Sequence, residues 1–198
     1  MADMIGTLRL RRETGTPDAL VAAFAAAAES DGLLDVAYTT YDAPFGRLVL
    51  GATPLGLVRV AFDPVDDVVA DLSTRLSPRI LLAPGRLDAV RRQLDEYFAG
   101  ARRVFAVDLD LRLAGSAFRR AVLAAADAIP YGQVRSYTEV ARSAGNPAAV
   151  RAVGTALGAN PVCVVVPCHR VLRADGSISG YAGGADNKGY LLHLEGAR

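Results

Sequence analysis

One stretch organises this chain, Pro161-Val162-Cys163-Val164-Val165-Val166-Pro167-Cys168-His169-Arg170-Val171. Its apolar, largely β-branched first part predicts a buried strand, and the polar triplet after Pro167 predicts a site at the end of that strand. A thiol in such a place is a candidate nucleophile, because the thiolate is the reactive form and a neighbouring base or cation favours it. We therefore predict that Cys168 is reactive, with His169 and Arg170 as candidates to activate it.

The other cysteine, Cys163, has a simpler interpretation. Free cysteines are mostly small hydrophobic core residues, and Cys163 stands inside the apolar run without a polar neighbour in sequence. Two cysteines five positions apart, in or beside one strand, form a poor disulfide pair, which agrees with a reducing compartment. With two cysteines and two histidines in the whole chain, the composition argues against a zinc site, and we expect no metal and no cofactor.

The composition is that of a soluble globular protein. The 198 residues are 52% hydrophobic and 22% charged, which is enough for one large or two small domains with a core. No apolar run reaches the roughly 18 residues of a membrane span, and the start lacks a secretory signal, so we expect a cytoplasmic protein with no membrane partner. Residues 1–107 hold 12 basic against 14 acidic residues, and residues 108–198 hold 10 against 7. The positive excess of the second half favours contact with a phosphate backbone, although ordinary scatter of surface charge would produce the same difference.

The first half of the chain changes its periodicity twice. Residues 1–34 are expected to be an appendage, in which Thr16 and Pro17 start an alanine-rich helix that runs to about Ser30. Period-two alternation from Val36 predicts an antiparallel meander, and the apolar spacing further on predicts two helices. The strands are expected at 36–41, 47–53, 57–62, 80–82 and 104–107, and the helices at 64–76 and 87–97. No motif in this half is typical of catalysis.

The second half is expected to be mostly helical beyond a linker at 108–115. Ser116 is the predicted N-cap of a first helix. A capping box in Ser136-Tyr137-Thr138-Glu139 begins a short second helix, and Gly145 ends it just before a third helix over 147–158. Two helices joined by so tight a glycine turn predict a helix-turn-helix.

The third helix has two unlike faces. One is apolar, and the other carries small residues around a single long cation, namely Ala148, Arg151, Thr155 and Gly158. Such a face can approach a duplex closely and suits the minor groove, whereas most helix-turn-helix proteins read the major groove with several long polar side chains. A packed helix with one solvated arginine is the alternative interpretation.

The motif Pro167-Cys168-His169-Arg170 resembles the active-site motif of the O6-alkylguanine-DNA alkyltransferases, also called methylated-DNA–protein-cysteine methyltransferases. Further stretches carry the same resemblance, collinearly, from about Ser116 to Gly196. These stretches are Pro130-Tyr131-Gly132-Gln133-Val134-Arg135-Ser136-Tyr137, Ala144-Gly145-Asn146-Pro147, Arg151-Ala152-Val153-Gly154, Gly158-Ala159-Asn160-Pro161, Gly180-Tyr181-Ala182-Gly183-Gly184, Lys188 and Leu191-Leu192-His193-Leu194-Glu195-Gly196.

The resemblance implies an α+β fold. Residues 35–107 would form a ribonuclease-H-like scaffold domain with a small antiparallel sheet and helices, which performs no hydrolysis in this family. Residues 108–198 would form a mostly helical, winged-helix-like helix-turn-helix domain that carries the alkyltransferase site. Residues 1–34 would be an N-terminal helical extension.

The resemblance also implies the reaction. The family repairs DNA by direct, irreversible transfer of an alkyl group from O6 of guanine to the protein's own cysteine, and we expect O4 of thymine as a second donor. The modified base lies inside the stack of a duplex, so it must be rotated out into a pocket. No group in this sequence could hydrolyse the thioether product. Each molecule is therefore expected to act once. We also expect it to be a monomer, and its partner to be double-stranded DNA that contains O6-alkylguanine.

Five residues take catalytic roles by this resemblance. The Cys168 thiolate would attack the alkyl carbon after activation through a water held by His169, whose other nitrogen is oriented by Glu195. Asn160 would connect the recognition helix to the active strand by side-chain hydrogen bonds. Tyr137 would crowd the phosphate of the rotating nucleotide and donate a proton toward guanine N3.

The DNA contacts are implied in the same way. Arg151 would fill the space that the rotated base leaves, and Tyr137, Ala148 and Thr155 would lie against the duplex beside it.

The substrate pocket would be formed by Val171, Tyr181, Ala182 and Gly183. Backbone groups of Cys168, Val171 and Ala182 would read the guanine edge, while Tyr181 and the glycines after it would form a mobile wall. Many family members have serine where this chain has Ala182, so a hydroxyl contact is missing here.

Two other classes of protein share parts of this pattern. A cysteine hydrolase also uses a cysteine, a histidine and an acid, but it releases product and turns over repeatedly. A non-catalytic lesion-binding module keeps the helix-turn-helix and the pocket. Family members of that kind replace the active cysteine, which is present here as Cys168.

Overall fold

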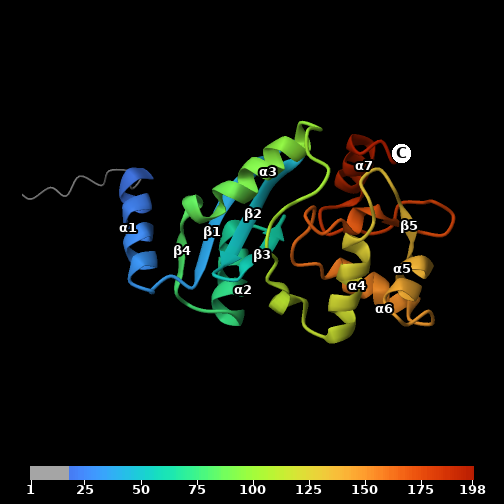
Figure 1. Cartoon of the computed structure of the whole chain (residues 1–198), viewed down its shortest axis with the longest axis horizontal. Coiled ribbons are helices and arrows are strands. Elements are labelled where there is room, and N and C mark those ends of the chain that lie inside the picture. Colours follow the sequence, from blue (N-terminus) through green and yellow to red (C-terminus); the bar gives the residue numbers. More distant parts are fainter. Residues whose placement is uncertain (1–17) are drawn as a thin grey trace, which may run out of the picture.

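The computed structural model describes residues 18–198 and places a sheet with flanking helices beside a bundle of helices (Figure 1). The predicted helix start at Thr16 and Pro17 lies outside the described residues. In chain order the elements are α1 Asp18–Ser30, β1 Val36–Ala43, β2 Gly46–Thr53, β3 Gly56–Ala61, α2 Val65–Arg75, β4 Ile80–Leu82, η1 Pro84–Leu87, α3 Asp88–Phe98, η2 Leu111–Ala114, α4 Ala117–Asp127, β5 Arg135–Ser136, α5 Tyr137–Ser143, α6 Val150–Gly158, η3 Cys168–Arg170, β6 Val171–Leu172 and α7 Ala185–Leu194, where η marks a 3-10 helix.

The first half is built on a four-stranded sheet of order β3-β2-β1-β4. β1, β2 and β3 form the predicted antiparallel meander, but β4 pairs with β1 in parallel, with Val36 opposite Ile80. The sheet is therefore mixed, and the expectation of an antiparallel sheet is wrong. The reason is the connection, because α2 carries the chain back between β3 and β4, and such a crossover permits parallel pairing.

The two faces of this sheet are covered by different helices. In β2, Leu48 and Leu50 face the core under α3, where they pack with Leu94, whereas Val49 points the other way and packs with Leu72 of α2. Figure 1 shows α3 and α2 on opposite sides of the sheet. Alternate side chains of a strand point to opposite faces, so the period-two pattern places one apolar set in each layer.

The outer edge of β3 is where the two halves of the chain meet. The Leu57 amide donates to the Asp108 carbonyl over 2.8 Å, and the Asp110 amide donates to the Leu57 carbonyl over 2.9 Å. Further along the same strand, the Val60 amide donates to the Pro161 carbonyl over 2.8 Å. This edge is therefore covered by the linker and by the start of the motif stretch, which leaves no open row of amides.

No strand forms over 104–107, where one was expected. The Ala106 amide donates to Oε1 of Gln93 over 2.7 Å, and the Ala106 carbonyl accepts from Nε2 of the same side chain over 2.9 Å. Because one side chain satisfies both backbone groups, this segment needs no partner strand. The linker pairs with β3 only at Leu109, through a single parallel bridge to Leu57.

The second half is helical, as predicted, and α4, α5 and α6 pack against one another. Ser136 and Glu139 form the predicted capping box at the start of α5. α6 begins at Val150 rather than at 147, because a turn closed by the Ala149 amide on the Asn146 carbonyl precedes it. β5 and β6 pair in parallel and form a two-stranded wing.

The apolar run at 161–166 is buried throughout, but it is not the predicted strand. Val164 has a left-handed φ of 73°, and the Val166 amide donates back to the Val162 carbonyl over 3.0 Å. β-branched residues rarely adopt a left-handed conformation, so a run of valines predicts an extended strand and gives no sign of this turn. The turn brings the chain from the edge of β3 to Cys168.

Candidate active site

Cys168 opens η3 directly after Pro167 and is only 4% exposed. Nδ2 of Asn160 donates to its Sγ over 3.2 Å and to the Val166 carbonyl over 2.9 Å, while Oδ1 of Asn160 accepts from the Val162 amide over 3.0 Å. The amide group of Asn160 is therefore held in one orientation, with one of its two N–H bonds directed at the thiol. The structure brings these two predicted residues into contact.

Three neighbours favour the thiolate form of Cys168. The neighbouring Cys163 thiol is the largest effect that lowers the pKa of Cys168, and the Asn160 amide and the positive charge of Lys188 lower it further, against burial, which raises it. The same contact with Cys168 is the largest effect that raises the pKa of Cys163 well above its ordinary value. Cys163 is buried, as predicted, but it has polar neighbours, including the Asn160 carbonyl 3.5 Å from its Sγ. Of the two thiols, Cys168 has the lower pKa.

His169 and Glu195 form a buried pair, with 3.0 Å between Nε2 and Oε1. Burial lowers the pKa of His169 below its ordinary value of 6.5, although Glu195 opposes this effect. The imidazole is therefore neutral near pH 7, and if Nε2 carries the proton that faces the carboxylate, Nδ1 is left as an acceptor. Nδ1 is buried and has no hydrogen-bond partner among the described residues. This arrangement suits a general base.

The carboxylate of Glu195 accepts hydrogen bonds from three further groups. Arg170 donates twice, from Nε over 2.8 Å and from Nη2 over 2.9 Å, the Tyr97 hydroxyl donates over 2.6 Å and the Gly132 amide over 3.2 Å. Burial raises the pKa of Glu195, but hydrogen bonds from His169 and Arg170 outweigh it and bring that pKa to about 2. The third guanidinium nitrogen of Arg170 donates to the Ile129 carbonyl. Arg170 therefore holds Glu195 and is not the cation that favours the thiolate.

Lys188 of α7 is that cation, and the sequence reasoning did not assign it a role. It is 1% exposed, and its Nζ donates to the Val171 carbonyl over 2.6 Å and to the Ser179 hydroxyl over 3.1 Å. Burial lowers the pKa of Lys188 to about 8. The composition held one sign that this position is special, because Lys188 is the single lysine among 22 basic residues. The Ser179 hydroxyl also lies 2.5 Å from the Tyr137 hydroxyl, which links Tyr137 to this group.

The predicted DNA-facing residues lie apart from the thiol, on the surface of the second half. Arg151 and Thr155 are exposed on α6, and Ala148 is exposed in the turn before it. Within residues 18–198, Arg151 forms no ion pair. Tyr137 is half-buried, and a Cβ added at Gly154 would meet its ring at 3.8 Å. Tyr137 therefore lies between the exposed helix face and the buried group around Lys188.

Three of the predicted pocket residues lie in the segment between β6 and α7, and the fourth, Val171, is the first residue of β6. The Tyr181 ring meets the His169 ring edge-on, with 6.4 Å between centroids, and Val171 is fully buried directly after η3. The Tyr181 hydroxyl is buried and has no hydrogen-bond partner within the described part of the chain. Ala182 is exposed and Gly183 is half-buried. Residues 181 to 183 therefore run from the ring of the buried His169 to the surface.

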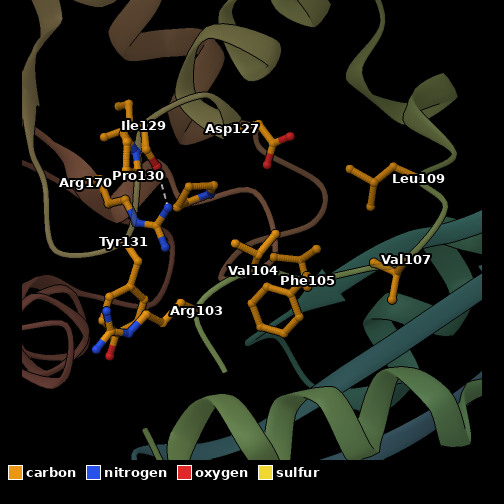
Figure 2. A pocket seen from close by; sticks show the side chains of 12 residues that line it. Arg103, Val104, Phe105, Val107, Leu109, Asp127, Ile129, Pro130, Tyr131 and Arg170 are labelled. Atoms are coloured by element: carbon orange, nitrogen blue, oxygen red, sulfur yellow. Dashed lines mark hydrogen bonds between the residues drawn. The ribbon is translucent and has the colours of Figure 1, made fainter. Parts of the chain in front are cut away.

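Two hollows adjoin this site. One, of ≈ 180 Å³, lies on the far side of the Arg170–Glu195 pair and is lined by Arg103, Asp127, Tyr131 and Arg170 among others (Figure 2). The other, of ≈ 310 Å³, lies between the two halves of the chain, and its lining includes Phe62, Asn160, Cys163 and Ala182. Cys168 and His169 line neither hollow, but Asn160, which donates to the Cys168 thiol, lines the second.

Two features are missing from residues 18–198, a metal site and a membrane-spanning helix. No three side chains of His, Cys, Asp or Glu gather closely enough there to hold a metal ion. No helix in this part of the chain combines the length and the apolar character needed to cross a bilayer.

Comparisons with known proteins match both halves of the chain. The family model of the 6-O-methylguanine DNA methyltransferase ribonuclease-like domain matches residues 36–111, and that of the DNA binding domain of the same enzymes matches residues 117–197. A methylated-DNA--protein-cysteine methyltransferase of Mycobacterium tuberculosis is 42% identical over 161 residues, which cover 81% of this chain and 93% of that protein. The inducible enzyme of Bacillus subtilis is 40% identical over 149 residues, 74% of this chain and 82% of that protein.

Solved structures match the fold over a similar span. The crystal structure of the Mycobacterium tuberculosis O6-methylguanine methyltransferase superposes with a TM-score of 0.71 at 39% identity and covers 82% of this chain and 94% of that one. The structure of the same organism's OGT in complex with DNA superposes with a TM-score of 0.71 at 40% identity, over 81% of this chain and 93% of that one.

The Glu195 carboxylate is expected to stabilise the fold in a pH-dependent way. Its folded-state pKa of about 2 lies below the ordinary 4.5, so its contribution is complete above about pH 4.5 and is lost as the pH falls toward 2. Glu195→Gln should lower the free energy of unfolding by about 3–5 kcal/mol at pH 7, because it breaks a buried charge pair. Chemical denaturation should show that the difference in free energy of unfolding between wild type and Glu195→Gln becomes smaller from pH 7 to pH 2.5. Glu96→Gln, at a surface pair with Arg102, is the control and should cost less than about 1 kcal/mol. A gap for Glu195→Gln that is constant with pH would contradict the assignment.

The Asn160 amide is expected to lower the pH at which Cys168 reacts. Asn160→Ala removes a donor to Sγ, so the midpoint of iodoacetamide alkylation at Cys168, followed by peptide mass spectrometry, should move to higher pH. Asn146→Ala, at an exposed turn position, is the control and should leave the midpoint in place. An unchanged midpoint in Asn160→Ala would show that the 3.2 Å contact does not favour the thiolate.

Proposed function

Because the chain belongs to the methylated-DNA–protein-cysteine methyltransferase family, we propose that Cys168 is the residue that accepts the alkyl group. The protein is a DNA-repair enzyme that transfers an alkyl group from O6 of guanine in DNA to a cysteine of its own. The observation that carries the assignment is the environment of Cys168, a buried thiol with a depressed pKa beside an oriented amide donor and a neutral histidine.

The transfer step follows from these groups. The Cys168 proton passes through a water molecule to Nδ1 of His169, and Glu195 stabilises the imidazolium that forms. The thiolate then attacks the alkyl carbon in line, so that a C–S bond forms as the C–O6 bond breaks. Guanine leaves with the electron pair of the broken bond, and Tyr137 donates a proton toward N3 to neutralise it. The buried Nδ1 and Tyr181 hydroxyl, which lack protein partners among the described residues, supply hydrogen-bonding sites for that water.

Access to the base requires its rotation out of the duplex, which costs about a few kcal/mol. The exposed face of α6 with Arg151 and Thr155, and Ala148 before it, lies against the minor groove, and Arg151 fills the vacated space. Tyr137 presses on the phosphate of the rotating nucleotide. Support comes from the position of the Tyr137 ring beside α6 and of its hydroxyl beside Ser179.

Recognition in the pocket depends on the backbone. Carbonyl and amide groups of Cys168, Val171 and Ala182 read the guanine edge, while Tyr181 and Gly183 enclose the alkyl group. A backbone edge of this kind also accepts a thymine alkylated on O4, which we propose as a second, weaker substrate. Because Ala182 has no hydroxyl, these contacts are limited to its main chain.

The proposal also covers turnover, oligomeric state, cofactors, location and domain limits. The protein acts once per molecule, since a thioether has no route to hydrolysis at this site, and it acts as a monomer without a cofactor. It works in the cytoplasm, in agreement with two free thiols. We place the domain boundary at 107/108, with 35–107 as the scaffold domain and 1–34 as an extension.

Stoichiometry and the position of the label test the assignment. Incubation with excess duplex that carries radiolabelled O6-methylguanine should give about one methyl group per protein, on Cys168. Cys163→Ala should retain this stoichiometry, and Cys168→Ala should lose transfer while still binding the duplex. Repeated turnover would favour a cysteine hydrolase, binding without transfer in the wild type would favour a lesion-binding module, and label on Cys163 would refute the assignment to Cys168.

The role of Arg151 is tested by two substrates. Arg151→Ala should slow transfer from duplex about tenfold or more relative to transfer from free O6-benzylguanine, because the free base needs no extrusion. Arg92→Ala, an exposed position on α3, should change neither rate. Equal losses on both substrates in Arg151→Ala would show that the side chain supports the fold instead of the base rotation.

A further inference from the structure

The adjacent glycines 183 and 184 are required for different reasons. Gly184 has a φ of 89°, and a Cβ there would meet nothing within 4 Å, so the backbone conformation favours glycine. Gly183 lies outside the left-handed region, but a Cβ there would come within 2.5, 2.6 and 2.9 Å of three ring carbons of Phe62. Side chains do not tolerate such separations. Gly183 is therefore constrained by a residue of the first half of the chain.

Phe62 is held in this position from several sides. It follows β3 directly, so its backbone is fixed by the strand whose edge pairs with Pro161. Its ring meets Tyr181 edge-on, with 5.8 Å between centroids and 72° between planes, and it lies 5.9 Å from the ring of Phe45. Phe45 in turn packs edge-on against Phe98. The Phe62 ring therefore has little freedom to withdraw from Gly183.

These contacts form a continuous row from the sheet to the active site. Phe62 touches Tyr181, and Tyr181 touches His169. The hollow of ≈ 310 Å³ between the two halves of the chain is lined by Phe62 on one side and by Ala182 on another. Removing the Phe62 ring would enlarge this hollow beside Ala182 and remove the contact with Gly183, so the wall could move back.

We propose that Phe62 is a specificity-determining residue, which limits the size of the O6 substituent by holding the wall of Tyr181 to Gly183 in place. This inference rests on the proposed function, where that wall encloses the alkyl group. It gives the first domain a part in substrate choice in addition to its part as scaffold. A methyl group fits without movement of the wall, whereas a benzyl group needs the wall to recede, and the Phe62 ring opposes that movement.

The experiment compares two substrates in the same duplex, O6-methylguanine and O6-benzylguanine, by their second-order transfer rates. Phe62→Ala should raise the benzyl rate relative to the methyl rate by roughly tenfold or more, the range over which an apolar pocket discriminates by size. Phe24→Ala is the control, because it removes an exposed ring of α1 that is not among the rings packed around Phe62. It should leave the ratio of the two rates unchanged.

A second pair of variants tests the contact itself. Gly183→Ala should slow transfer of both substrates in the wild-type background, because the new methyl group meets the Phe62 ring. In the Phe62→Ala background the same change should cost little, so the two substitutions should be strongly non-additive. Phe62→Leu gives a smaller opening with less risk to folding, and it should shift the ratio of rates in the same direction.

The outcomes separate this inference from the assignment of function. A wild-type protein that does not transfer methyl groups would overturn the proposed function. A wild-type protein that does, together with an unchanged ratio of rates in both Phe62 variants or additive losses with Gly183→Ala, would overturn only the role of Phe62.

Discussion

The buried carboxylate of Glu195 is the group on which the rest of the site depends. A charge without partners in the interior would be very costly, and this one is matched by Tyr97, Gly132, His169 and Arg170. These donors come from α3, from the turn after α4 and from η3, so the carboxylate fixes the positions of three segments relative to the end of α7. The orientation of the histidine, and through it the chemistry of the thiol, follows from an electrostatic requirement of the fold.

The tight turn after α6 solves a second problem, which is how to place a nucleophile in the interior without leaving polar groups unpaired. Asn160 satisfies the Val162 amide and the Val166 carbonyl, and the remaining N–H is directed at Cys168. The left-handed Val164 is the unfavourable part of this arrangement. One side chain thus stabilises the turn and the thiolate together, so the reactivity of the cysteine and the shape of the loop are properties of the same contacts.

Local signals in the sequence predict local structure well. The capping box at Ser136 and the strand meander are found where the pattern placed them. The failures concern long-range pairing, because Gln93 replaces a strand partner for Ala106 and the buried valine run turns back on itself. The site shows the same division. Adjacent Cys168 and His169 could be predicted from the motif, but the separation of roles between Arg170 and Lys188 depends on which distant groups each one meets, and spacing carries no information on that.

The pairing of β3 with Pro161 has a consequence for the order in which the chain assembles. Val60 and Pro161 are 101 positions apart in the sequence (161 − 60), so the strand is synthesised well before this partner emerges from the ribosome. Contacts of such sequence separation form late and slowly, and until then the edge amides and the apolar valine run are both exposed. The reactive cysteine is therefore among the last parts of the molecule to reach its final environment, so the thiol of a nascent chain becomes buried and protected only when its two halves have met.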